Sequence, residues 1–206
     1  MKISFNLSSI TLRVLAFGLA LIVCASLMGA ELRRFMTGVL ASPFVTIDLA
    51  VIEAATAYFP NSAKVHARLA SQMVESQLDG QQSHELVADK AFRHATKAVE
   101  LAPANFEYRI LLSAAAELKG DADAAESALR EAVRLAPNNI NVRWQMANLL
   151  LRVGKVEESL PEFRYVAEAY PGWLANTLDL LWRASGGEMA VLERVVGDSA
   201  KAKLTF

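Results

Sequence analysis

Between residues 124 and 136, apolar side chains recur at intervals of three and four positions. This spacing places them on one face of an α-helix and leaves the charged residues on the opposite face. Pro137 follows directly, and because proline cannot continue a helix, we expect the helix to end there, with Asn138 or Asn139 capping the next one. The apolar positions are Ala125, Ala128, Leu129, Ala132, Val133 and Ala136.

The pattern repeats at a fixed interval. Pro103, Pro137 and Pro171 are 34 residues apart, and so are Gly120 and Gly154. A period of this length, with small and apolar residues at fixed positions, is typical of stacked helix–turn–helix units. A single pair of helices cannot bury its apolar face alone, so we expect neighbouring pairs to stack into a solenoid.

Two consecutive units, residues 106–139 and 140–173, resemble the tetratricopeptide repeat (TPR). They depart from the family pattern at its tryptophan position, which Arg109 and Arg143 occupy. The resemblance implies an all-α solenoid of antiparallel helix pairs over residues 49–196. The matching positions are Leu112, Ser113, Gly120, Ala125, Leu129, Ala132 and Pro137 in the first unit, and Met146, Ala147, Gly154, Ser159, Phe163 and Pro171 in the second.

Further helical segments flank these two units. A polar stretch, Gln77–Glu85, predicts a loop inserted between the two helices of an earlier unit. Residues 197–206 form either a short cap or the start of a repeat that is cut short. The additional predicted helices are Val45–Phe59, Ala63–Glu75, Asp89–Ala102, Trp173–Ala184 and Met189–Val196.

The N-terminal region is the most hydrophobic part of the chain. Val14–Ala30 contains no charged residue, which predicts a retained single-pass membrane helix, with a cleaved secretory signal as the alternative. We therefore divide the N-terminus into an anchor or signal (1–30) and a juxtamembrane segment (31–48). A slight excess of basic charge from Lys2 and Arg13 places the N-terminus inside and the repeats outside the cytoplasm, in the periplasm if the source is bacterial.

Charge and motifs argue against several functional classes. A net charge of −1 provides no basic field for nucleic acid. His66, His84 and His94 include no pair at the i,i+4 spacing that places two metal ligands on one helix face. The sequence lacks a phosphate-binding glycine loop and a Gly–x–Ser–x–Gly motif. We therefore expect no catalysis, no metal and no cofactor.

The resemblance also implies a binding groove, because the first helix of each unit lines the concave face of such solenoids. Asn148 resembles the groove asparagine of repeats that hold a peptide backbone. Trp144 and Trp182 are candidate aromatic anchors, with burial between repeats as the alternative. The candidate partner-binding residues are Lys64, Arg68, Trp144, Asn148, Arg152 and Trp182.

Two functional hypotheses follow. The first is a non-catalytic, membrane-tethered scaffold or adaptor that binds a protein or peptide partner. The layout is similar to bacterial TPR proteins of envelope or surface-polysaccharide assembly. The alternative is a permanent structural subunit of a membrane protein complex with no exchangeable ligand, in which small residues such as Gly18 and Gly29 pack against other helices.

Overall fold

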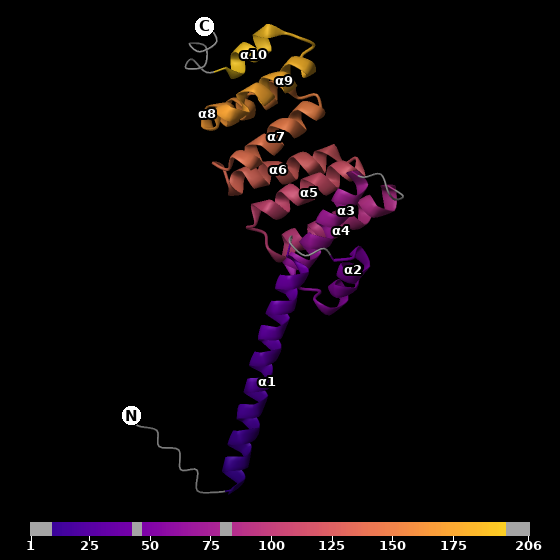
Figure 1. The fold of residues 1–206 in the computed structure, drawn as a ribbon, viewed down its shortest axis with the longest axis vertical. Helices are drawn as coiled ribbons and strands as arrows, with labels where there is room; N and C mark the ends of the chain where they lie inside the picture. The colour runs from indigo at the N-terminus through magenta and orange to yellow at the C-terminus, as the bar shows by residue number, and fades with distance from the viewer. Residues whose placement is uncertain (1–9, 43–46, 79–83, 197–206) are drawn as a thin grey trace, which may run out of the picture. The chain divides into compact units, whose positions relative to one another are not determined.

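The computed structural model describes residues 10–42, 47–78 and 84–196, without the side chains of 10–17, 78 and 84. The chain divides into two compact units, residues 1–48 and 49–206. Every regular element in the described ranges is a helix, and these ranges contain no strand (Figure 1). The prediction of an all-α protein is therefore confirmed.

The first unit consists of a single long helix, α1 (Ile10–Leu40). It continues without a break from the apolar run into residues 31–40, where Glu31 and Arg34 form an ion pair of 2.9 Å one turn apart. Its large apolar side chains point outward, and Leu19, Met28 and Phe35 are each about two-thirds exposed.

The prediction of a membrane anchor in this unit is wrong. Among the residues that the structure describes, no helix combines the length and the apolar character needed to cross a membrane. Glu31, Arg33 and Arg34 lie on the same helix directly after the apolar run. The single-pass topology and the extracytoplasmic location that depended on this anchor are withdrawn with it.

The second unit is a stack of helices in chain order (Figure 1). Three antiparallel pairs, α3/α4, α5/α6 and α7/α8, form its centre, while α2 packs on α3 and α9 and α10 pack on α8. The predicted pairs are therefore confirmed. The elements are α2 (Leu49–Tyr58), α3 (Ala63–Leu78), α4 (His84–Leu101), α5 (Phe106–Lys119), α6 (Ala122–Leu135), α7 (Ile140–Arg152), α8 (Val156–Ala169), the 3₁₀ turn η1 (Pro171–Trp173), α9 (Leu174–Ala184) and α10 (Met189–Val195).

The 34-residue period of the sequence reappears in the chemistry of the turns. Asn105 and Asn139 each cap the first helix of a unit, because their side-chain oxygens accept hydrogen bonds from backbone N–H groups of the first turn. Gly120 and Gly154 follow the same helices, with φ angles of 82° and 79° that glycine adopts without strain. Repeated caps and glycines thus set the length of each first helix.

Small side chains allow the helices to approach one another closely. Ala116, Ala125 and Ala132 are fully buried between α5, α6 and α7, and Leu129 and Met146 fill the remaining space. A second cluster, centred on the fully buried Phe163 and Leu181, joins α7 and α8 to α9 and α10. Because each cluster connects one helix pair to the next, burial continues along the stack, as expected for a solenoid.

Several boundaries differ from the sequence-based expectation. Helix α2 begins at Leu49, after the non-helical Ile47 and Asp48, whereas a helix was predicted over Val45–Phe59. Helix α3 continues to Leu78, and α4 begins at His84, so both extend into the polar segment that was predicted to be a loop. Glu85 is exposed at the start of α4, whereas Gln77 is buried near the end of α3, so the polarity of this segment did not mark a loop. The predicted cap or truncated repeat over residues 197–206 lies outside the described residues.

Candidate protein-binding surface

The helices of the second unit form two layers. The first-helix layer contains α3, α5, α7 and α9, and the second-helix layer contains α4, α6, α8 and α10. Contacts run along each layer: α3 packs on α5, and α8 packs on α10. Side chains extend these links, because Arg152 of α7 reaches Glu117 of α5, and Arg130 of α6 reaches Glu158 of α8.

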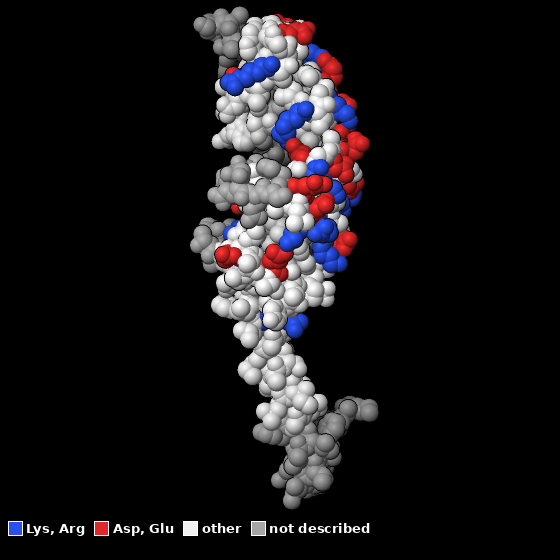
Figure 2. All heavy atoms as spheres, turned by 90° about the vertical axis from the view of Figure 1, so that its right-hand side faces the viewer, with Lys and Arg blue, Asp and Glu red and all other residues white. Residues whose placement is uncertain are grey.

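Charged side chains of the second-helix layer are largely paired with one another. The Glu126 carboxylate, whose side chain is only 12% exposed, accepts from Arg130 at 2.6 Å and from Lys155 at 2.7 Å. These hydrogen bonds, that of Lys155 foremost, lower the pKa of Glu126 below its ordinary value. Figure 2 shows the same intermixing, with blue and red atoms interspersed along one edge of the solenoid and no separate field of either sign.

A hollow of about 290 Å³ opens on this second layer between α8 and α10. The guanidinium of Arg164 donates to the backbone carbonyl of Arg194, and the Arg194 side chain pairs with Glu157 at 2.7 Å. Both cations are thus engaged within the protein, which makes the hollow a poor site for an anionic ligand. Its lining residues are Leu160, Pro161, Arg164, Tyr165, Glu168 and Arg194.

The first-helix layer has a different character. It presents a mixture of partly buried apolar and polar side chains on successive helices, which is the composition of many protein interfaces. The partly buried residues include Ser71 of α3, Ile110 and Ala114 of α5, Gln145 and Leu151 of α7, and Leu178 of α9.

The predicted site residues at the two ends of this layer are accessible. Lys64 lies exposed in the first turn of α3, and Arg68 follows one turn later with its side chain half-buried. Trp182 lies near the end of α9 and is 45% exposed. One edge of its indole ring covers Gly187, where an added Cβ atom would come within 3.2 Å of the ring.

Trp144 has a mainly structural environment. Its ring meets the fully buried Phe163 edge-on at 5.6 Å between centroids, and meets Trp173 edge-on at 4.7 Å. Such aromatic pairs stabilise packing between helices. The structure therefore places Trp144 against the cluster that joins α7 and α8 to the C-terminal helices, which corresponds to the alternative of burial between repeats.

Asn148 and Arg152 follow Trp144 along α7 at the predicted spacing. The Asn148 amide donates to the Trp144 carbonyl at 2.8 Å, so its N–H₂ group is engaged within its own helix. The Arg152 guanidinium binds the Glu117 carboxylate through both Nε and Nη2. The structure thus brings the three residues to one helix, but each already has a partner inside the protein.

Sequence reasoning missed the role of Arg143. Its guanidinium donates to both oxygens of Glu162 and to the carbonyl of Pro137, and it lies 4.9 Å from the centre of the Tyr165 ring. It therefore links the first helix of its unit, α7, to the second, α8, and to the turn that precedes α7. The occurrence of arginine at this position in both units was the available signal.

In the described part of the chain, no cluster of three or more histidine, cysteine, aspartate or glutamate side chains is arranged to hold a metal ion.

No protein-family model and no curated protein matches the sequence. Among solved structures, the chain resembles MamA, with a TM-score of 0.56 and 14% identity over 71% of this chain and 76% of that one. It also resembles YrrB, described as a TPR protein with an unusual peptide-binding site (TM-score 0.55, 19% identity, 71% and 72% coverage). It resembles a thermophilic TPR protein from Thermus thermophilus as well, with a TM-score of 0.54 and 21% identity over 68% of this chain and 70% of that one.

Proposed function

We propose that this chain is a non-catalytic interaction module that binds a protein or peptide partner along its first-helix layer. The chain has the TPR fold, and its structural neighbours include a protein with a peptide-binding site. Assembly of envelope or surface-polysaccharide machinery, the setting that the sequence resemblance implies, is where we would first look for the partner.

The contrast between the two layers carries this proposal. In the second-helix layer, glutamate and arginine side chains such as Glu126, Arg130 and Glu158 bind one another. In the first-helix layer, the exposed Lys64 and Trp182 lie at opposite ends. Between them lie partly buried apolar residues such as Ile110 and Leu151, which also pack against the two core clusters. A partner that covers this layer gains apolar burial at its centre and a cationic or aromatic contact at either end.

The six candidate residues have different parts in this proposal. Three of them contact the partner directly: Lys64, Arg68 and Trp182. The side-chain oxygen of Asn148 accepts a hydrogen bond from a backbone N–H of the partner. Trp144 and Arg152 hold α7 in position, through Trp173 and Glu117 respectively.

Site-specific photo-crosslinking in intact cells of the source organism tests the proposal. A photoreactive amino acid is placed at Gln145 or Trp182 in the first-helix layer, and at Arg134 or Glu168 in the second-helix layer as matched controls. We expect one partner to crosslink at both first-layer positions and at neither control. Crosslinks confined to the controls would overturn the proposal.

A second candidate is a permanent subunit of a larger complex. The outward-facing apolar residues of α1, including Leu19, Ile22, Leu27 and Phe35, favour it, because large apolar side chains are usually covered in a working assembly. In that case, crosslinks should also form from α1, and the partner should remain at a fixed ratio to this chain after dilution. A partner that exchanges on dilution supports the interaction module instead.

A further inference from the structure

Two histidines from consecutive helices meet near the N-terminal end of the solenoid. The Nδ1 atoms of His66 on α3 and His94 on α4 are 2.9 Å apart, and the rings stack at 5.2 Å between centroids. The other ring nitrogen of His66, Nε2, lies 3.0 Å from the carbonyl oxygen of Pro60, in the turn between α2 and α3. The His66 side chain therefore connects this turn to α4.

The chemistry of these three groups fixes the positions of the protons. A carbonyl oxygen only accepts, so His66 Nε2 carries a hydrogen and donates to Pro60. A neutral imidazole has a single N–H, so His66 Nδ1 is an acceptor, and His94 Nδ1 must donate to it. In the native state His66 is thus the Nε2–H tautomer and His94 the Nδ1–H tautomer.

This arrangement limits how many protons the pair can hold. One proton can add at His94 Nε2 without breaking either hydrogen bond. A second would have to add at His66 Nδ1, where two N–H groups would then face each other at 2.9 Å. His66 is only 7% exposed, so its charge would also lack water. The unfolded chain, in contrast, can protonate both rings.

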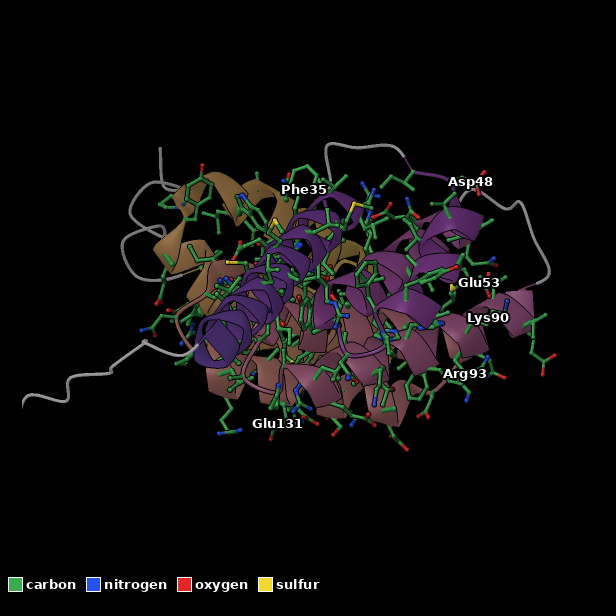
Figure 3. The ribbon with its side chains drawn as sticks, turned by 90° about the horizontal axis from the view of Figure 1, so that it is seen from below. Phe35, Asp48, Glu53, Lys90, Arg93 and Glu131 are labelled. Carbon is green, nitrogen blue, oxygen red and sulfur yellow. The ribbon has the colours of Figure 1, made fainter. Side chains whose placement is uncertain are left out.

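The charged residues around the two histidines do not allow the pair to bind more protons. Glu53 of α2 pairs with Lys90 of α4 at 2.7 Å, and Arg93 lies further along α4 (Figure 3). Burial, followed by the neighbouring His66, lowers the pKa of His94, and Arg93 and Lys90 act in the same direction, while Glu53 opposes them. The Glu53–Lys90 pair is a second link between α2 and α4.

We propose that His66, His94 and the Pro60 carbonyl form an acid-sensitive latch that holds α2 and its following turn on the α3/α4 pair. Helix α2 is the element that opens, because it packs chiefly on one neighbour, α3, through buried residues such as Ile52 and Ala55. Opening of this terminal helix and its turn separates Pro60 from His66, so the His66 ring can turn away from His94 and reach water. Release of α2 uncovers an apolar face of α3 at low pH.

The sign of the effect follows from proton binding. The native pair binds fewer protons than the unfolded chain below the ordinary histidine pKa of about 6.5, so protection of α2 is complete above that pH and declines as the pH falls. Where the closed and open states differ by one proton, the equilibrium shifts about tenfold per pH unit.

Hydrogen exchange of the full-length chain at pH 7.5 and 5.5, corrected for intrinsic exchange, tests the latch. We expect amides of α2 and of the first turn of α3 to lose protection about tenfold at the lower pH, while those of α7 and α8 do not. The substitution His94→Gln should abolish the difference, because the glutamine amide can offer its N–H₂ to neutral His66 or its oxygen to protonated His66. His84→Gln is the matched control, and in this variant the loss of protection of α2 at pH 5.5 should remain.

Two outcomes would overturn the proposal: equal pH responses of α2 and α7, or an unchanged response in His94→Gln. If that variant does not fold, ¹⁵N spectra of the imidazole nitrogens in the unaltered protein decide the matter. At pH 7.5 they should show the Nε2–H tautomer for one buried ring and the Nδ1–H tautomer for its neighbour. Two Nε2–H tautomers would exclude the latch.

Discussion

The guanidinium of Arg152 on α7 binds the carboxylate of Glu117 on α5, with Nη2 at 2.6 Å from Oε2 and 2.9 Å from Oε1, and Nε at 3.0 Å from Oε2. The pair crosses between consecutive units near the C-terminal ends of their first helices. It thus fixes the spacing of two helices in the proposed binding surface.

We expect a modest coupling energy from this pair. Arg152 is 53% exposed and Glu117 is 30% exposed, so solvent screens the interaction and a double-mutant cycle of Glu117→Gln and Arg152→Gln should give about 0.5–1 kcal/mol. Urea unfolding of the unaltered protein, the two single variants and the double variant measures this coupling energy. The coupling should shrink between about 0.1 M and 1 M salt, where the Debye length falls from ~10 Å to ~3 Å. A coupling that is independent of salt contradicts a screened surface pair.

Trp144 and Trp182 were both predicted to be aromatic anchors, but their substitution should change the free energy of unfolding by different amounts. Trp144→Ala removes ring contacts with Phe163 and Trp173 and should cost about 3–5 kcal/mol of unfolding free energy. Trp182→Ala removes a ring that is 45% exposed and should cost about 1 kcal/mol or less. Chemical unfolding followed by circular dichroism measures both. A larger loss for Trp182 would show that the structural assignment is reversed.

The same two residues should also separate in partner capture. Per folded molecule, Trp182→Ala should lower crosslinking at Gln145, whereas a conservative Trp144→Phe change should leave it nearly unchanged. Normalising capture to the folded fraction at low temperature separates binding from stability. Loss of capture in Trp144→Phe but not in Trp182→Ala would assign the contact to Trp144.

The helices were predictable because their signals are local. Asn139, one of the two predicted caps, does cap α7, and Gly154 follows that helix as the period requires. The pairing of Arg152 with Glu117 was not predicted, since it depends on side-chain geometry across two units. Residues one period apart become neighbours in a stack, so opposite charges at a spacing of 35 were the available signal.

The largest error concerned α1, where apolar composition suggested a membrane span. Among the residues that the structure describes, no helix is both long and apolar enough to cross a bilayer, and a bilayer span requires both properties. The contact between His66 and His94 was also invisible to motif spacing, because it joins two helices instead of one helix face. Metal-ligand patterns at i,i+4 do not detect such pairs.

The glycines at the ends of the first helices should be sensitive to substitution. Gly120→Ala and Gly154→Ala place a Cβ atom at φ angles near +80°, although no neighbouring atom blocks it, so backbone strain alone should cost about 1–2 kcal/mol each. Gly172→Ala is the matched control, since that residue lacks a positive φ and its added Cβ would make an ordinary contact of 3.4 Å with Tyr170. Equal midpoints of thermal unfolding in all three variants would contradict the strain argument.

The pairing of Glu126 with Arg130 and Lys155 should make stability depend on pH in the acidic range. Because the hydrogen bonds lower the pKa of Glu126 in the folded state, their contribution is complete above the ordinary carboxyl pKa of about 4.3 and is lost as the pH falls through the lower native value. Glu126→Gln should therefore cost about 1 kcal/mol near pH 7, a modest amount because both cationic partners are about half-exposed. The difference should shrink as the pH falls below this range and Glu126 takes up a proton. Urea unfolding at several pH values, with Glu168→Gln on an exposed face of α8 as the control, measures this. A Glu126→Gln cost that persists unchanged at pH 3 would show that packing, and not charge, makes the residue stabilising.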